Sequence, residues 1–346
     1  MIGVVARLRT LSRVDHSLIN QDGEDRAVFT PIIPKPAASN EKVTGYLHAA
    51  YSQSLSQFGS PRFLKASGAW ILERPIPDSA YSDAMGCYPL FACRDWSDLH
   101  IDLENIGRSI VSLSLVTDPF GEYEPAYLSR CFPEVTAPFK EHFVVDLSRP
   151  VEEFVSSHHR RNADKALAEV SVERCLDPKN SLNEWTALYR TLVERHGITG
   201  IAAFSRESFA RQLSVPGMVA FRAVREDATV GMVLWYEQGN RVYYHLGAYS
   251  PFGYELRASF GLFDASIRHF AQRQFEWLSL GAAAGVDTDP SQGSGLHRFK
   301  RGWSTDTRTA YFCGRIFDQK KYQEIIASKG VPPTNYFPAY RLGEFS

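Results

Sequence analysis

The residues best suited to chemistry lie together near the C-terminal end, in the stretch GLHRFKRGW (residues 295–303). Six basic, titratable or aromatic residues stand there: His297, Arg298, Phe299, Lys300, Arg301 and Trp303. A positioned ammonium stabilises the oxyanion that forms during attack on an ester or thioester carbonyl, and arginine binds phosphate through paired hydrogen bonds. The stretch is a candidate catalytic or substrate-facing loop, in which Lys300 is the candidate cation. The competing interpretation of Lys300 is a surface lysine that caps a loop.

An amine that attacks a carbonyl must lose a proton, so this chemistry also needs a general base or a chain of water molecules. His297, beside Lys300, and His245, in a predicted strand, are the two candidate bases. A hydrogen-bonded core histidine is the competing interpretation of His245. The sequence does not choose between the two.

Three arginines outside this stretch are candidates for substrate binding. Arg160 and Arg161 belong to a basic run on a predicted helix, for which a solvated helix face is the competing interpretation. Arg257 stands at the start of a long predicted helix, where an anionic group would meet both its charge and the helix N-terminus.

Aromatic residues complete the candidate substrate-binding set. Tyr243 alternates with His245 on one face of a predicted strand, so both side chains point into either a cleft or the core. For Tyr243, Phe299 and Trp303 the alternative to substrate binding is packing in the core. For Arg298 the alternative is a side chain that is simply solvated.

Composition excludes several classes of protein. The 346 residues include 38 Lys plus Arg and 39 Asp plus Glu, a net charge of −1, so an anionic ligand must be met by a local cluster and a general nucleic-acid binder is disfavoured. Five scattered cysteines lack metal-ligand spacing, and we expect reduced thiols and no metal site. No apolar run approaches the roughly 20 residues of a membrane helix, and the N-terminus lacks a signal-peptide pattern. We therefore expect a soluble cytoplasmic protein, with peripheral membrane contact left open.

The elements that must position these residues are clearest in the second half of the chain. Apolar residues from Trp185 to Val193 recur at helical spacing, and Gly197 follows as the expected C-cap. Three β-like runs within residues 218–250, separated by two short turns, predict an antiparallel meander. A helix over residues 256–270 and strands over residues 275–283 and 309–317 are expected to follow.

The first half has a weaker pattern. Residues 1–42, rich in proline and polar residues, predict an arm or loop. Helices are expected over residues 43–58 and 96–106, and strands over residues 68–76 and 109–116. A short strand over residues 143–147 precedes a helix for which Ser148 is the expected N-cap and Pro150 lies in the first turn.

Three stretches, taken in order, resemble the Fem family, the FemABX-like and related BioF2-like acetyltransferase proteins of bacteria. They are VVDLSRPVEEFVSSHHRRNADKALAEVSVE (144–173), YHLGAYSPFGYELRASFGLFDASIRHFAQRQFEWLSLGA (244–282) and GLHRFKRGW (295–303). Proteins of that family hold two GNAT-like domains in tandem. The resemblance implies an α/β (α+β) fold with mixed, mostly antiparallel sheets. It also implies a diverged first GNAT-like domain over residues 43–142 and a second over residues 143–346.

The resemblance implies an enzyme that moves an acyl group onto an amine. An N-acyltransferase with an acyl-CoA (acetyl-CoA) donor and an amine acceptor on a small molecule or cell-envelope precursor is the first hypothesis. Aminoacyl-tRNA is the donor of peptidoglycan-bridge members and is the alternative; a catalytically inactive binding protein with the same fold is another. Phe299 and Lys300 match the segment whose lysine lies close to the reacting carbonyl, and Arg160 and Arg161 match a basic segment that meets phosphates.

The chain departs from these patterns in two places. The Arg/Gln-x-x-Gly-x-Gly/Ala loop with which ordinary GNAT enzymes cradle the CoA pyrophosphate is absent, since Arg257 and Gly261 have a different spacing. The long paired-helix insertion of some tRNA-dependent members is not seen either. The identity of the donor therefore stays open.

Overall fold

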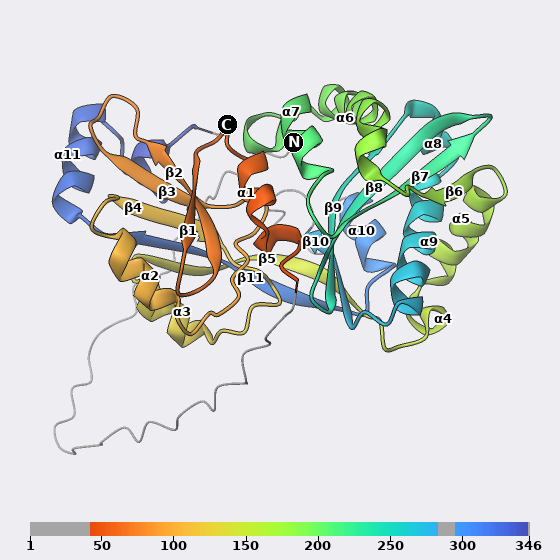
Figure 1. Ribbon diagram of the computed structural model, residues 1–346, viewed down its shortest axis with the longest axis horizontal. Coiled ribbons are helices and arrows are strands. Elements are labelled where there is room, and N and C mark those ends of the chain that lie inside the picture. The colour runs from red at the N-terminus through yellow and green to blue at the C-terminus, as the bar shows by residue number, and fades with distance from the viewer. Residues whose placement is uncertain (1–41, 283–294, 345–346) are drawn as a thin grey trace, which may run out of the picture.

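The computed structural model describes residues 42–282 and 295–344. Within them, one mixed sheet of eleven strands runs through the molecule in the order β1-β2-β3-β4-β11-β5-β10-β9-β8-β7-β6 (Figure 1). The strands are β1 (Ser60–Leu64), β2 (Ala69–Pro75), β3 (Ser82–Gly86), β4 (Ser112–Val116), β5 (Val135–Asp146), β6 (Ser171–Arg174), β7 (Met218–Arg225), β8 (Ala228–Gln238), β9 (Arg241–Tyr249), β10 (Trp277–Ala282) and β11 (Asp306–Ile316). Strand β3 runs parallel to β4, and β9 to β10, whereas the other pairs are antiparallel. The predicted α/β fold with a mostly antiparallel sheet is confirmed; the arm predicted for residues 1–42 lies outside the described residues except for Lys42.

Helices cover both faces of this sheet. They are α1 (Ala49–Ser54), α2 (Leu99–Ile106), α3 (Pro125–Cys131), α4 (Val151–Phe154), α5 (Ser157–Leu167), α6 (Leu182–His196), α7 (Arg206–Gln212), α8 (Pro251–Glu255), α9 (Ala258–Gln272), α10 (Gly295–Arg301) and α11 (Gln319–Lys329). Over the strands of the second half, α5 and α9 contact each other on one face of the sheet. On the other face pack α6 and α7, together with α1 from the first half.

Two hydrophobic clusters lie on these two faces. The α9 cluster includes Val145 and Phe263, and the α6 cluster includes Val144 and Trp185. The neighbours Val144 and Val145 enter different clusters because successive side chains of a strand point to opposite faces. Each face of the second half is therefore sealed by its own helical layer.

The predicted antiparallel meander is confirmed as β7, β8 and β9. Glu226 and Asp227 join β7 to β8 with positive φ angles of 50° and 62°, as a two-residue type I′ hairpin requires. Gly197 follows α6 in the left-handed conformation (φ 58°, ψ 43°), which confirms the predicted C-cap. Local turn and cap chemistry is sufficient to define this part of the fold.

The strand predicted over residues 143–147 is wrong in its extent, because it is the end of the much longer β5. Pro138 lies within β5, which a proline tolerates only at an edge or a bulge. The β5–β11 register shifts between Ala310 and Tyr311, and Tyr311 lies opposite Pro138. The bulge accommodates the proline, so the strand extends well before residue 143.

The single helix predicted after Ser148 is also wrong, because the structure has two helices there. The Ser148 hydroxyl donates a hydrogen bond to the carboxylate of Asp146 (2.6 Å) and caps no helix. Val155 has an extended backbone (φ −69°, ψ 124°) that ends α4. Ser156 is the cap of α5, and its hydroxyl accepts a hydrogen bond from the backbone N–H of His159.

Strands β9 and β10 separate part-way along their length. β10 pairs with β9 only over Trp277–Ser279, opposite Arg241–Tyr243. Beyond this point β9 stays paired with β8 across a register shift between Leu234 and Trp235, and β10 stays paired with β5 across a register shift between Ser279 and Gly281. We call this point the strand split, because the edges of β9 and β10 that face each other no longer pair there.

Strand β11 lies in the middle of the sheet although it is the last strand in the sequence (Figure 1). It pairs with β5 over residues 306–314 and with β4 over residues 312–316. The strands of the first half thereby join those of the second through β11. The predicted domain boundary at residue 143 falls inside β5, and the division into two domains stays a prediction.

A buried ion-pair network fastens the C-terminal end to the first strands. Asp83 of β3, which is fully buried, accepts hydrogen bonds of 2.8 and 2.9 Å from Arg341. Nε of Arg74, on β2, lies 3.3 Å from the same carboxylate. Glu344 pairs with both arginines, at 3.1 and 3.0 Å, through a side chain that is 29% exposed. The network places the C-terminal segment over β2 and β3.

Candidate functional site

The stretch predicted to be a substrate-facing loop is a helix, α10, from residue 295 to residue 301. Phe299 packs against Phe263 of the α9 cluster, with ring centres 4.8 Å apart, and Trp303 is fully buried. Arg298 and Arg301 are exposed on the helix. The prediction of a loop is wrong. A helix lets Phe299 pack into the core, just before the buried Trp303, while Arg298 and Arg301 stay in solvent.

Lys300 points inward from α10 and is only 5% exposed. Its Nζ donates a 2.6 Å hydrogen bond to the carbonyl oxygen of Ala282, the last residue of β10. Nζ lies 5.5 Å from the centre of the Tyr244 ring on β9, and a Cβ built on Gly281 would lie 3.2 Å from it. The amine therefore lies at the strand split, and its burial excludes the surface-lysine interpretation.

The surroundings of Lys300 lower its affinity for a proton. Burial, with a smaller contribution from the charge of Lys140, lowers the pKa of Lys300 to about 7. Near neutral pH the amine therefore exchanges between its charged and neutral forms. Groups that stabilise a developing anion or move a proton are commonly tuned in this way.

His142 and Lys140 of β5 also belong to the surroundings of Lys300, although neither is among the residues predicted from the sequence. His142 lies opposite Ala282 in the β5–β10 ladder and is 7% exposed. Burial, followed by the charges of Lys300 and Lys140, lowers the pKa of His142 to about 3. The only signal in the sequence is the two-residue spacing of Lys140 and His142, which places both on one face of a strand.

His159 docks α5 onto α10. One ring nitrogen, Nδ1, lies 2.7 Å from the hydroxyl of Ser156, and Nε2 lies 2.9 Å from the carbonyl oxygen of Phe299. The ring also meets Trp303 edge-on, with centres 5.1 Å apart. Burial lowers the pKa of His159, so the neutral ring is the form that fastens α10 in position.

Replacing Gly302 with alanine is expected to destabilise this contact. An ideal Cβ at Gly302 would lie 2.0 Å from Cε1 of His159, so either α5 must shift or the ring must leave its hydrogen bonds. Overpacking of this kind costs about 1–3 kcal/mol, which urea unfolding followed by circular dichroism would measure. Gly295→Ala is the matched control, because no described atom lies within 4 Å of a Cβ there; equal midpoints for the two variants would contradict the prediction.

Tyr243 and His245 lie on the opposite face of the sheet from Tyr244 and do not meet Lys300. The Tyr243 hydroxyl donates a 2.7 Å hydrogen bond to the buried carboxylate of Asp118. His245 has both ring nitrogens engaged, with the hydroxyl of Tyr46 (3.1 Å) and the side-chain oxygen of Gln212 (3.0 Å). Burial lowers the pKa of His245 to about 3. Both residues therefore occupy the core on the α6 side.

The remaining predicted residues lie on the surface or at its edge. Four arginines are exposed: Arg160, Arg161, Arg257 and Arg298. Arg160 donates a 3.1 Å hydrogen bond to the carbonyl oxygen of Glu152, and Arg257 occupies the N-cap position of α9 with a left-handed backbone (φ 56°). The partly buried His297 packs edge-on against Phe143, with ring centres 5.0 Å apart. The structure thus joins His297, Phe299 and Trp303 to the helix that carries Lys300.

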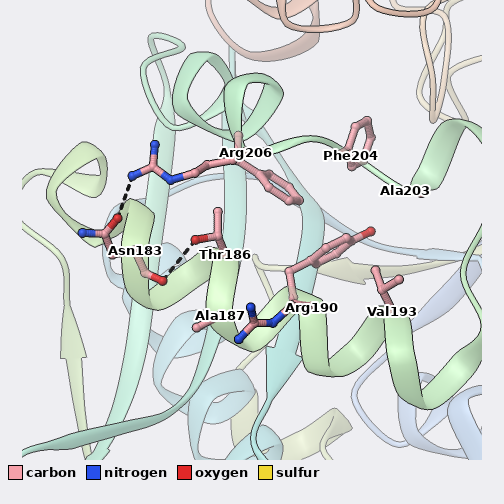
Figure 2. Close-up of a pocket in the computed structure, with 10 residues that line it drawn as sticks. Asn183, Thr186, Ala187, Arg190, Val193, Ala203, Phe204 and Arg206 are labelled. Carbon is pink, nitrogen blue, oxygen red and sulfur yellow. Dashed lines mark hydrogen bonds between the residues drawn. The ribbon is translucent and has the colours of Figure 1, made fainter.

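A surface hollow of about 540 Å³ lies beside α6 and α7 (Figure 2). Its lining includes Phe204, Arg190 and Arg206, and Arg206 donates a 2.7 Å hydrogen bond to the side-chain oxygen of Asn183. None of the residues predicted from the sequence to act in catalysis or binding lines it. The hollow lies over the α6 face and is not the surroundings of Lys300.

Residues 156–301 match the family model of the acetyltransferase (GNAT) domain. The chain carries a GNAT-type domain. The matched segment runs from the start of α5 to the end of α10 and so includes the meander, α9, β10 and Lys300. Comparison with curated protein sequences finds no match.

Solved structures extend the GNAT-type likeness to most of the chain. FemX is similar with a TM-score of 0.62 and 12% identity, over 80% of this chain and 93% of that one. The C-terminal domain of a protein described as a lysylphosphatidylglycerol synthetase from Agrobacterium fabrum is similar with a TM-score of 0.56 and 13% identity, over 84% of this chain and 93% of that one. L-PGS from Bacillus licheniformis is similar with a TM-score of 0.50 and 13% identity, over 83% of this chain and 98% of that one. At these identities the likeness concerns the fold, and it confirms the resemblance to FemABX-like proteins.

Residues 42–282 and 295–344 show neither a metal-binding cluster nor a membrane-spanning helix. No group of three or more His, Cys, Asp or Glu side chains is arranged to hold a metal ion. No helix in the same residues has the length and apolar character needed to span a bilayer.

Proposed function

We propose that the protein is an N-acyltransferase that moves an acyl group from a CoA thioester of the acetyl-CoA type onto an amine of a small molecule or cell-envelope precursor. The observation that carries the proposal is the position of Lys300, an almost fully buried amine at the strand split. The GNAT match over residues 156–301 and the fold shared with FemX support it.

The strand split offers a place for an extended donor. Beyond Tyr243, the edge of β9 that faces away from β8 pairs with no other described strand. An extended chain with amide groups can add to such an edge as a further strand does. The N-terminus of α9 and the exposed Arg257 lie further along the chain, and we assign the phosphates of the donor to them, because both bind anions.

Lys300 is assigned to the reacting carbonyl. Attack of the acceptor amine on the thioester gives a tetrahedral oxyanion, and the charged amine of Lys300 donates to this oxygen through N–H groups not used by Ala282. The exposed Arg160 and Arg161, on α5, are assigned to anionic groups of the acceptor. The neutral fraction of Lys300 near pH 7 implies that binding of an anion recharges the amine.

Calorimetric titration with acetyl-CoA at moderate salt tests the donor. The natural protein is expected to bind about one equivalent, and Lys320→Ala, an exposed lysine on α11, is expected to behave in the same way. Lys300→Ala is expected to bind more weakly or to bind without turnover, measured as thiol release with a set of amines. If the natural protein gives no heat up to millimolar acetyl-CoA, the CoA donor is overturned and aminoacyl-tRNA is the donor to test. If the natural protein binds acetyl-CoA but transfers no acyl group to any amine, an inactive binding protein is favoured.

A further inference from the structure

His142 is an exception among the buried histidines near α10 and β9. It is 7% exposed, and Nδ1 is buried without a hydrogen-bond partner within the described residues. His159 and His245, by contrast, engage both ring nitrogens. A buried nitrogen without a partner costs free energy, so Nδ1 of His142 is a candidate for contact with a bound molecule.

The geometry places His142 beside the proposed reaction centre. It lies opposite Ala282 in the β5–β10 ladder, and the carbonyl of Ala282 accepts the hydrogen bond from Lys300. On its other side His142 lies opposite Arg308 of β11, whose guanidinium stacks on the rings of Phe120 and Trp277. His142 has the same parity on β5 as Val144 and so lies on the α6 face of the sheet, whereas Tyr244 and α10 pack on the α9 face. The imidazole and the amine therefore approach the same end of β10, next to the strand split, from opposite faces of the sheet.

Resting on the proposed N-acyltransferase function, we infer that His142 is a further catalytic residue, whose Nδ1 accepts the proton that the attacking amine loses. The candidate bases from the sequence are His297, whose ring packs on Phe143, and His245, which is held in the core by two hydrogen bonds. His142 differs from His245 in having a ring nitrogen available for a substrate.

The step balances as follows. The neutral acceptor amine forms a bond from its nitrogen to the carbonyl carbon of the thioester, and the carbonyl π electrons move to the oxygen, which faces Lys300. The nitrogen then gives a proton to Nδ1 of His142. Collapse of the tetrahedral intermediate breaks the carbon–sulfur bond, and the leaving thiolate takes up a proton that His142 can return. The products are an amide and a free thiol.

The surrounding charges keep His142 in the form that this step needs. Burial and the charges of Lys300 and Lys140 hold the pKa of His142 at about 3, so the ring is neutral at neutral pH. The same charges disfavour a cationic ammonium at the site and favour the neutral, nucleophilic amine. When the oxyanion forms, its negative charge offsets the lysines and raises the basicity of His142 as the proton moves.

Nitrogen NMR of the full chain with ¹⁵N-labelled histidine tests the state of the ring without any need for turnover. The His142 signals are assigned by their loss in His142→Gln. Across neutral pH the inference expects Nδ1 without a proton and Nε2 with one. A proton on Nδ1 would overturn the inference, because that nitrogen could not accept another from the neutral form.

Kinetics of acyl transfer test the role itself. His142→Gln is expected to lower kcat by about 10²–10⁴-fold with little change in KM for the donor, whereas His100→Gln, at an exposed position of α2, keeps kcat. Thermal melting confirms folding, and His142→Asn replaces the variant if His142→Gln does not fold. If Lys300→Ala is inactive while both His142 variants keep full kcat, the inference fails and the proposed function stands. If the natural protein transfers no acyl group from acetyl-CoA or from aminoacyl-tRNA, the proposed function fails and the inference with it.

Discussion

A Lys300→Met variant is expected to lose activity and to gain stability. Methionine fills a similar volume without a charge, so the substitution removes the cost of burying an amine that is 5% exposed. It also removes the donor assigned to the oxyanion, which lowers turnover by about 10²–10³-fold. Opposite effects on activity and stability are the mark of a residue kept for function.

The gain in stability is expected to depend on pH. The pKa of Lys300 is about 7 in the folded protein against an ordinary 10.5, so the unfolded chain binds more protons between these two values and stability of the natural protein rises with pH there. Below pH 7 the amine is charged in both states and the full penalty applies, up to about 5 kcal/mol. The advantage of Lys300→Met is therefore largest below pH 7 and fades as pH approaches 10.5.

Urea unfolding on either side of this pH window would measure the effect. Lys320→Met, at an exposed position of α11, is the matched control and is expected to change stability little at any pH. A Lys300→Met variant whose stability difference is the same at low and high pH would show that the amine is not held with a lowered pKa.

Asp83→Ala is expected to be the most destabilising single substitution in the first half of the chain. The change leaves Arg74 and Arg341, each with a side chain only 6% exposed, without the fully buried carboxylate that both contact. Removing one partner of a buried ion pair costs about 3–5 kcal/mol. The free energy of unfolding, measured in urea, is the quantity to compare.

Glu344→Ala supplies the control for Asp83→Ala. Glu344 contacts the same two arginines, but its side chain is 29% exposed, so its loss is expected to cost about 1 kcal/mol or less. Similar losses from the two variants would mean that burial of Asp83 does not decide the stability of the network.

Local signals in the sequence predict the second half of the fold well. The turn residues Glu226 and Asp227 and the C-cap Gly197 act within a few positions of themselves, so the meander and α6 follow from them. The predictions that are wrong depend on distant partners. Pro138 is tolerated because β5 bulges beside it where it pairs with β11, and α10 forms because Phe299 meets α9.

For the candidate site, too, the sequence predicts what depends on nearby residues and misses what depends on distant ones. The basic and aromatic motif of residues 295–303 indicates Lys300 as a candidate, but it does not indicate that Lys300 is buried at the end of β10. Tyr243 and Tyr244 are neighbours on β9, and only the packed sheet tells which of them faces Lys300. His142 gives no motif, since its relation to Lys300 arises from the pairing of β5 with β10.

The central place of β11 determines when the chain is most vulnerable during its synthesis. The ribosome delivers residues 306–316 after all the other strands, so β4 and β5 each wait with an open edge for the strand that lies between them. Open edges pair readily with other chains, and pairings between distant parts of a chain form slowly. The nascent protein therefore passes through a stage with two incomplete half-sheets, and the time spent there, more than the stability of the finished sheet, sets its exposure to aggregation.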